Sequence, residues 1–235
     1  MAGDDEVKHE GYCLMHIIEE YDKMFSLQKR LNQARFDGKI SDTVIFLEHH
    51  PCYTIGRQGG EDHILVSDNC LEREGIRVYE TDRGGDITYH GPGQLVCYPI
   101  IDLHEYSSDV HVYAHKLEEV MILTLEKFDI NGARKKGFPG VWVGEKKIGF
   151  MGVGINHWVT MHGISLNVCP DMKYFTQIIP CGIANVTVVS MAEILGHPIT
   201  VNEVAEEMRQ HFEEVFDIQL QDMNLDKVEE MVRNV

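Results

Sequence analysis

The residue with the clearest capacity for covalent chemistry is Cys181, which stands between Pro180 and Gly182. A Pro-Cys-Gly sequence predicts a tight turn that exposes the thiol and leaves room beside it for a substrate. The thiolate is the nucleophilic form of cysteine, and at neutral pH it needs a positively charged neighbour. We therefore expect Cys181 to act as a nucleophile if a cationic side chain folds against it.

The other five cysteines are weaker candidates for a nucleophile. Cys13, Cys97 and Cys169 lie in or beside apolar strand patterns, where a thiol behaves as a small hydrophobic group. Cys52 and Cys70 fall in predicted loops without an evident activating group. The chain has no CxxC pair and no secretion signal, so we expect free thiols rather than disulfides.

Three side chains could supply the positive charge beside Cys181. Lys147 begins a strand pattern whose glycines, at 149, 152 and 154, leave one side bare, and bare strand backbone often marks the close approach of a ligand. His90 and His162 are the alternatives, because a Cys–His pair is also a common arrangement. The residue pattern alone leaves the choice between lysine and histidine open.

A second concentration of functional residue types runs from Arg83 to Tyr98, with the sequence RGGDITYHGPGQLVCY. Its glycines permit unusual backbone conformations or close approach of a ligand, and Arg83 and His90 offer polar chemistry. From Ile87 onward the residues favour a strand. We expect a strand or hairpin with a glycine-lined binding surface. A plain hairpin with Gly91-Pro92-Gly93 as its turn is the alternative interpretation.

We expect neither a metal site nor a nucleotide site. The run Glu48–Arg57 contains two histidines and a cysteine, but their spacing matches no common zinc pattern, and Pro51 stiffens the run. Arg57 is a candidate ligand contact or, alternatively, a solvated loop arginine. The glycine-rich segment 140–155 lacks GxGxxG, and GxxxxGK[ST] occurs nowhere in the chain.

The apolar periodicity predicts an alternation of strands and helices. Helices are expected over 19–36 and 107–128, the latter capped by Ser108, with short helical turns at 71–73 and 171–175 and capping-box helices starting at Ser190 and Thr200. Strands are expected over 11–17, 43–47, 76–81, 141–143, 147–155 and 161–168. This order predicts an α/β fold of the α+β type: one domain over residues 1–235, with a mixed sheet flanked by helices and flexible ends at 1–10 and 222–235.

The charge balance excludes some classes of partner. The 21 basic and 38 acidic residues give a net charge of −17, which argues against nucleic acid and anionic membranes. No apolar run approaches the roughly 20 residues that span a bilayer. The acidic N-terminus lacks the features of a signal peptide, so we expect a cytoplasmic monomer, or an organellar form without its transit peptide.

Several motifs together resemble the lipoyl (octanoyl) transferase family. They are Arg83–Gln94 with Tyr98, Lys147-Ile148 followed by Gly152-Val153, His162-Gly163 with Leu166-Asn167, and Pro180-Cys181-Gly182-Ile183. Glu48-His49 with Tyr53–Arg57 is similar to a further block of the family. The resemblance extends from about residue 11 to about residue 195.

The resemblance implies the fold of the biotin/lipoate protein ligases and an enzyme that needs no cofactor. The family transfers an octanoyl group from acyl carrier protein to the lysine of a lipoyl domain, in 2-oxoacid dehydrogenase complexes or in the glycine cleavage H protein. Cys181 would form an acyl-thioester, and Lys147 would stabilise the thiolate and shuttle a proton.

The resemblance also implies which residues line the acyl pocket. They are Arg83, Gly84, Gly85, Asp86, Ile87, Thr88, Tyr89, His90, Phe150, Met151, Gly152, Gly163, Ile164 and Ser165. Ile164-Ser165 replaces a more apolar pair of many relatives, and Gly149-Phe150-Met151 is a local variation on the lysine strand, which leaves the preferred acyl length open.

Three other functions are compatible with the sequence. An ATP-dependent lipoate or biotin protein ligase of the same fold would not need Cys181, a thioesterase would use water as acceptor, and an acyl-binding protein would not catalyse. Because the chain and acyl carrier protein are both acidic, docking calls for a local basic patch, which we expect at Arg134, Lys135, Lys136 and Lys146.

Overall fold

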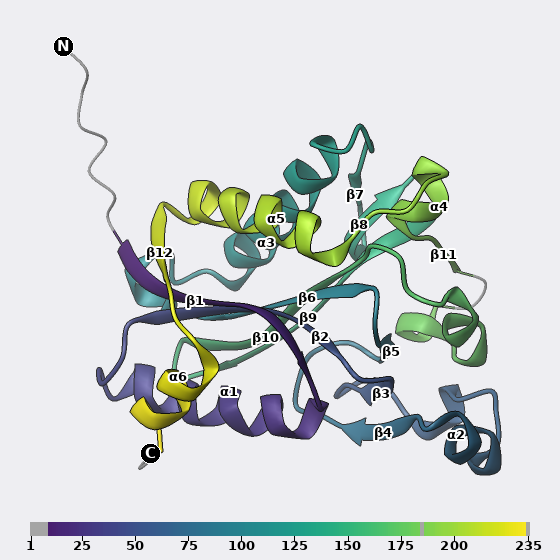
Figure 1. The fold of residues 1–235 in the computed structure, drawn as a ribbon, viewed down its shortest axis with the longest axis horizontal. Coiled ribbons are helices and arrows are strands. Elements are labelled where there is room, and N and C mark those ends of the chain that lie inside the picture. The colour runs from purple at the N-terminus through teal and green to yellow at the C-terminus, as the bar shows by residue number, and fades with distance from the viewer. Residues whose placement is uncertain (1–8, 184–185, 234–235) are drawn as a thin grey trace.

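A large mixed sheet forms the centre of the molecule in the computed structural model, which describes residues 9–183 and 186–233 (Figure 1). Its strand order is β12-β1-β2-β6-β10-β9-β8-β7, with β11 paired to β9. β1 pairs in parallel with both β2 and β12, and β11 pairs in parallel with β9, whereas the other pairs are antiparallel. The strands are β1 (His9–Glu19), β2 (Asp42–His49), β6 (Gln94–Ile100), β7 (Ala133–Lys135), β8 (Phe138–Val143), β9 (Lys146–Asn156), β10 (Val159–Asn167), β11 (Thr187–Val188) and β12 (Ile218–Asp222).

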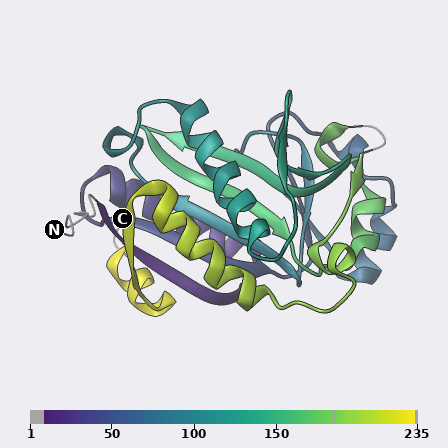
Figure 2. The ribbon, with the colours of Figure 1, turned by 90° about the horizontal axis from the view of Figure 1, so that it is seen from above.

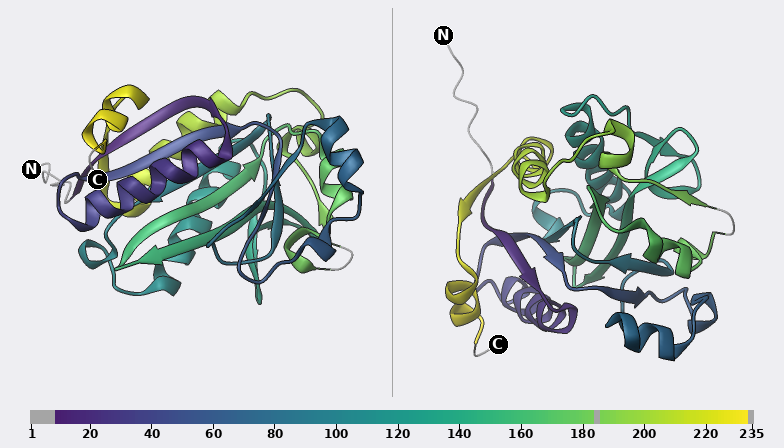
Figure 3. Two further views of the ribbon diagram at one scale, coloured as in Figure 1. Left: turned by 90° about the horizontal axis from the view of Figure 1, so that it is seen from below. Right: turned by 45° about the vertical axis from the view of Figure 1, so that its right-hand side comes forward.

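Helices cover both faces of this sheet. α3 (Val110–Glu126) and α5 (Val201–Phe216) lie side by side on one face, as Figure 2 shows from above. α1 (Tyr21–Phe36) and the short α6 (Leu225–Met231) lie on the opposite face, which Figure 3 shows from below. Each face buries a separate apolar cluster. The expected mixed sheet flanked by helices is therefore confirmed.

Local sequence signals explain where several helices begin and end. Ser190 and Thr200 form complete capping boxes at α4 (Met191–Leu195) and α5. Each cap satisfies backbone N–H groups that have no partner within the helix. α3 begins later than expected, because Asp109 rather than Ser108 accepts the first backbone N–H groups of the helix.

A smaller three-stranded sheet lies beside one end of the large sheet, with order β4-β3-β5. Its strands are β3 (Cys52–Ile55), β4 (Arg77–Glu80) and β5 (Ile87–His90), and its neighbours are α2 (Asp68–Glu74) and the 3₁₀ turns η1 (Glu61–His63), η3 (Met172–Gln177) and η4 (Pro180–Gly182). A further 3₁₀ turn, η2 (Leu103–Glu105), follows β6. A third apolar cluster joins the small sheet to Phe150 of β9 and Phe175 of η3.

The hairpin interpretation of Arg83–Tyr98 is wrong. β5 pairs with β3 in the small sheet, whereas β6 pairs with β2 and β10 in the large one. The turn between β5 and β6 is held from outside, since the backbone N–H of Gly93 donates to Glu48 Oε2 at 2.6 Å. The motif therefore joins the two sheets instead of closing one ribbon.

Three smaller expectations also need correction. Cys52 lies buried in β3 and not in a loop, whereas Cys169 is exposed and not packed. Residues 9–10 already belong to β1. The C-terminal segment contains α6, whose Val228 is buried against the core, so the described part of 222–235 is not a free end; residues 1–8 and 234–235 lie outside the described residues.

Within the described residues, no helix is long and apolar enough to cross a membrane.

Gly163 of β10 tests how tightly the central strands approach each other. A β-carbon at this position would collide with the backbone carbonyl oxygen of Cys97 and lie 2.8 Å from Pro99. We predict that Gly163→Ala lowers the free energy of unfolding by roughly 1–3 kcal/mol, because overpacked backbone cannot relax freely. Urea denaturation measures this difference.

Gly84→Ala is the matched control, since the nearest atom to its added β-carbon is the carbonyl oxygen of Val153, at an ordinary 3.4 Å. Equal stability losses in the two variants would show that the close approach at Gly163 is unimportant.

Candidate active site

Cys181 lies in the η4 turn with its backbone in the left-handed region, at φ 58° and ψ 19°. A non-glycine residue in this region costs about 1–3 kcal/mol and persists only where the surroundings enforce it. Here η4 is tied to η1, because Ile179 N–H donates to the carbonyl of His63 at 2.9 Å. The expected tight turn is confirmed, and it leaves the thiol half-buried at the edge of two cavities.

Lys147 of β9 brings its ammonium nitrogen, Nζ, to 3.4 Å from Cys181 Sγ. Nζ also donates to the carbonyl of Pro139 at 2.8 Å and lies 5.1 and 5.4 Å from the ring centres of Phe150 and Trp142. Only 2% of Lys147 is exposed, and within the described residues no carboxylate pairs with it. In general, an ammonium group close to a thiol favours the thiolate form.

The two candidate histidines are engaged elsewhere. His90 Nδ1 bonds to Gln94 Oε1 at 2.7 Å, and His162 Nε2 bonds to Asp82 Oδ1 at 2.7 Å. Burial lowers the pKa of both imidazoles, which keeps them neutral near pH 7. The geometry thus places Lys147, and neither histidine, against the sulfur of Cys181.

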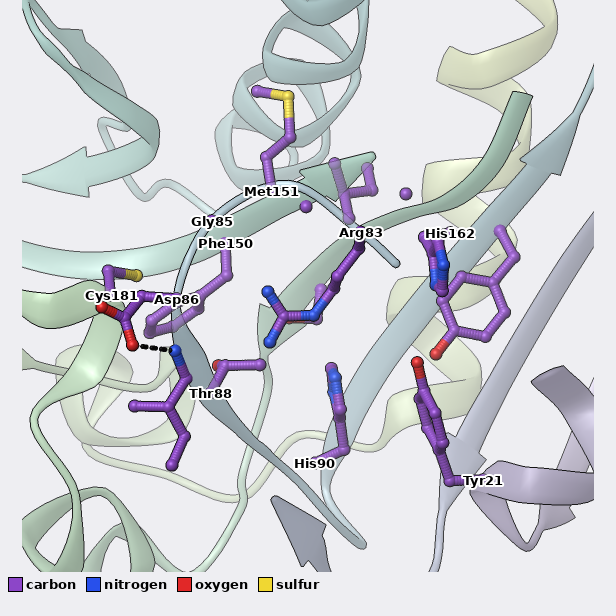
Figure 4. Close-up of a pocket in the computed structure, with 16 residues that line it drawn as sticks. Tyr21, Arg83, Gly85, Asp86, Thr88, His90, Phe150, Met151, His162 and Cys181 are labelled. Carbon is purple, nitrogen blue, oxygen red and sulfur yellow. Dashed lines mark hydrogen bonds between the residues drawn. The ribbon is translucent and has the colours of Figure 1, made fainter. Parts of the chain in front are cut away.

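A small inner cavity of about 40 Å³ begins at Cys181 and runs between the two sheets (Figure 4). Cys181 and Asp86 lie at one end, Tyr21 and His162 lie at the other, and Arg83 extends between them. Most of the expected substrate-binding residues line this space: Arg83, Gly85, Asp86, Ile87, Thr88, His90, Phe150, Met151, Gly152, Gly163, Ile164 and Ser165.

Two of the expected residues lie elsewhere. Tyr89 points to the opposite face of β5, because side chains alternate along a strand. Its ring stacks on that of Tyr174, with ring centres 4.8 Å apart, and packs edge-on against Phe175, with ring centres 5.5 Å apart. Gly84 lines the outer cleft instead of the inner cavity. The structure therefore corrects the expectation that the whole segment from Arg83 to His90 lines one pocket.

Tyr21, Tyr98 and His162 line the inner cavity although they were absent from the expected pocket residues. Tyr98 and His162 occur within the motifs that resemble the family, and this placement could have indicated that they line the pocket. Tyr21 has the helical spacing of an ordinary apolar core position in α1, and only the packing of α1 beneath the sheet brings it to the cavity.

Arg83 is buried and forms part of the cavity wall. Its guanidinium donates to the carbonyl and Oγ1 of Thr54 and to the carbonyl of Gly84. Burial lowers the pKa of Arg83. The guanidinium nevertheless stays charged at neutral pH, because its ordinary pKa is very high. Among the described residues it has no carboxylate partner, and the cavity consequently carries a fixed positive charge.

A larger outer cleft of about 780 Å³ opens on the other side of Cys181 and Lys147. It shares Gly85, Asp86, Met151, Gly152 and Cys181 with the inner cavity. Cys181 therefore stands where a small cavity meets a much larger cleft, which suits a reaction that passes a group from one bound partner to another.

The expected basic patch is largely neutralised. Arg134 pairs with Glu118 at 3.1 Å and Glu119 at 2.6 Å, and Lys135 pairs with Glu145 at 2.6 Å. Over residues 9–183 and 186–233, no ion pair is formed by the other two cations of the patch, Lys136 and Lys146. The positive charge available for docking is thus smaller than the sequence indicated.

The fold is that of the biotin/lipoate protein ligases. A crystal structure of lipoate-protein ligase A bound with ATP matches with a TM-score of 0.75 at 17% identity, covering 95% of this chain and 93% of that chain. At such an identity the likeness defines the fold alone.

Comparisons of sequence define the family more narrowly. The family model of the lipoyl protein ligase A/B catalytic domain matches residues 20–213. An octanoyltransferase from Solibacter usitatus is 43% identical over 86% of this chain and 90% of that protein. One from Caldicellulosiruptor saccharolyticus is 38% identical over 94% of both. The chain therefore belongs to the octanoyltransferase family, whose members are acyltransferases, and the resemblance seen in its motifs is confirmed.

The pair Lys147–Cys181 predicts an order of thiol reactivity. We expect iodoacetamide to alkylate Cys181 before the more exposed Cys169, because partial desolvation and Glu48 raise the pKa of Cys169. Lys147→Met should slow alkylation of Cys181 by about tenfold or more and leave Cys169 unchanged. Peptide mass spectrometry after timed labelling measures both rates. Faster labelling of Cys169 than of Cys181 in the unmodified chain would contradict this prediction.

The buried His49 predicts a loss of stability in acid. Its Nε2 lies 2.9 Å from the Tyr98 hydroxyl, and burial lowers the pKa of His49 to about 4. Between pH 6.5 and 4 the unfolded chain binds a proton that the folded one does not, so stability falls as the pH falls. The contribution of this one group is on the order of 3 kcal/mol.

Urea denaturation of His49→Gln across this pH range should show a shallower dependence than the unmodified chain. The neighbouring His50 is exposed, and His50→Gln serves as the control. An unchanged slope in His49→Gln would contradict the prediction.

Proposed function

We propose that this octanoyltransferase transfers an octanoyl group from acyl carrier protein to the lysine amine of a lipoyl domain, through an acyl-thioester on Cys181. The observation that carries the proposal is the 3.4 Å contact between Lys147 Nζ and Cys181 Sγ at the junction of the two cavities. The acceptors are the lipoyl domains of 2-oxoacid dehydrogenase complexes or the glycine cleavage H protein. No cofactor enters either step.

In the first half-reaction the Cys181 thiolate attacks the thioester carbonyl of the donor. The carbon–sulfur bond to the carrier breaks, and the departing carrier thiolate takes a proton from the Lys147 ammonium. Lys147 is then neutral beside an acylated Cys181. Exchange of one thioester for another is nearly balanced in free energy, so the intermediate can accumulate.

In the second half-reaction the acceptor amine attacks the acyl group on Cys181. Neutral Lys147 takes the proton from the attacking nitrogen, and the electron pair of the broken carbon–sulfur bond stays on Sγ. The ammonium–thiolate pair is restored. Formation of the amide draws the overall reaction forward.

The acyl chain is expected to occupy the inner cavity. Phe150, Met151, Gly152 and Ile164 are among the residues that line it. A space of about 40 Å³ holds only about one or two water molecules, so an octanoyl group must displace side chains to enter. Met151 is unbranched and lines both cavities, which makes it the side chain best able to move.

We further infer that the chain is a single catalytic domain and acts as a monomer. The family match over 20–213 takes in elements of both sheets and helices of both faces, and both proposed catalytic residues lie within it. The site also contains residues from the large sheet and the small one, so neither part forms it alone.

Intact-mass measurement tests the covalent step. After octanoyl-acyl carrier protein is added without ATP, we predict that the wild-type chain gains one octanoyl group, that Cys181→Ser gains none, and that Lys147→Ala gains it at least about 100-fold more slowly. Addition of a lipoyl domain should then discharge the wild-type adduct onto the domain.

The same experiment separates the alternative functions. A requirement for ATP, with full activity in Cys181→Ser, would indicate a protein ligase. Release of free octanoate at the full rate without a lipoyl domain would indicate a thioesterase, and absence of any adduct or turnover would indicate an acyl-binding protein.

A further inference from the structure

Asp86 stands in the wall between the inner cavity and the outer cleft and lines both. It precedes β5 and is 9% exposed. Figure 4 shows its carboxylate next to Cys181 at the same end of the cavity. A carboxylate at this point can contact a substrate group that approaches the sulfur from the outer cleft.

The acceptor presents a particular chemical requirement on that open side. A lysine side chain has a pKa of about 10.4 in water and arrives as an ammonium ion. Most ionisable groups lining the outer cleft are lysines, an arginine and histidines. The lysines and the arginine repel a cation, and a neutral histidine carries no charge to attract one. The cleft therefore needs a carboxylate to bring the ammonium to the acyl group.

Of the carboxylates that line the outer cleft, Glu118 is already engaged. Its Oε2 pairs with Arg134 Nε at 3.1 Å, and its Oε1 accepts from the backbone N–H of Gly140 at 2.9 Å. Both oxygens serve the fold of β7 and β8 against α3. Glu118 is thus unavailable to a substrate, which leaves Asp86.

Asp86 has one engaged oxygen and one that the described residues leave open. Oδ1 accepts from His63 Nδ1 at 2.8 Å and from the backbone N–H of Ile87 at 2.6 Å. Across residues 9–183 and 186–233 no donor is bonded to Oδ2. A β-carbon added to Gly182 would collide with Oδ2, so this oxygen is aimed at the backbone beside Cys181.

We propose that Asp86 binds the ammonium group of the acceptor lysine through Oδ2 and holds it beside the acyl-thioester on Cys181. This assignment rests on the proposed function and deepens it by naming the group that recognises the acceptor amine. His63 acts as a positioning residue, since its bond to Oδ1 fixes the direction of Oδ2. The hydrogen bond from His63 to Asp86 also raises the pKa of His63, as expected for an imidazole beside a carboxylate.

The proton balance is compatible with this role. The bound ammonium gives one proton to water in the open cleft and becomes a neutral amine. The amine attacks the acyl carbon, its second proton passes to neutral Lys147, and the electron pair of the broken carbon–sulfur bond stays on Sγ. Asp86 neither gains nor loses a proton over the cycle.

The test separates the two half-reactions in Asp86→Asn, which keeps the shape of the side chain and removes its charge. Acylation of Cys181 by octanoyl-acyl carrier protein is followed by intact mass. The isolated acyl-enzyme is then mixed with a lipoyl domain or with hydroxylamine, a nucleophile that is uncharged at neutral pH. Asp62→Asn is the matched control, because Asp62 is a nearby exposed carboxylate that lines neither cavity.

We expect Asp86→Asn to form the acyl-enzyme, and its acyl-enzyme to react with hydroxylamine, at rates within about twofold of wild type. Its rate of octanoyl transfer to the lipoyl domain should fall about 10- to 100-fold, as for loss of a charge-assisted hydrogen bond. Asp62→Asn should match wild type throughout. Equal losses with both nucleophiles, a loss of acylation itself, or no loss at all would each overturn the role of Asp86. Absence of any acyl-enzyme in the wild-type chain would instead refute the proposed function.

Discussion

The contact between the Lys147 ammonium and the Cys181 sulfur is the interaction on which the rest of the site depends. A buried ammonium is costly unless a partner of opposite charge or strong acceptors surround it. Here the partners are one carbonyl oxygen and the sulfur. The large sheet fixes the lysine, since β9 is held on both sides by β8 and β10, and the tie between η1 and η4 fixes the cysteine. Each half of the pair is therefore held by a different part of the fold.

The two cavities meet at this contact, since both include Cys181. The inner one is lined by residues of the large sheet, the small sheet and α1, and it carries the buried charge of Arg83 and a neutral histidine, His90. The outer one is the larger, with a volume of about 780 Å³. Because both spaces reach Cys181, the proposed mechanism keeps the acyl group in one space while donor and acceptor exchange in the other. The fold is shared with lipoate-protein ligase A, and in this chain a thiol stands at the junction of the two spaces.

Much of the local structure could be predicted from sequence. The capping boxes at Ser190 and Thr200 and the apolar run of β2 lie where the sequence indicated, because caps and periodicity depend on neighbours within a few residues. Pairing of strands was harder. The Arg83–Tyr98 motif has the composition of a hairpin, yet its two strands join different sheets. Strand-forming character shows that a segment will pair and does not specify its partner.

The sequence by itself determined the family and most of the elements that carry the site, and it singled out Cys181 as the candidate nucleophile, because residue types such as a cysteine between proline and glycine have fixed chemistry. Tertiary structure alone decided between lysine and histidine as the neighbour of Cys181, brought Tyr21 to the cavity, turned Tyr89 away from it and paired His63 with Asp86. These facts depend on contacts between residues far apart in the chain. Such contacts are set by strand order, packing and the direction of each side chain, none of which a linear pattern records.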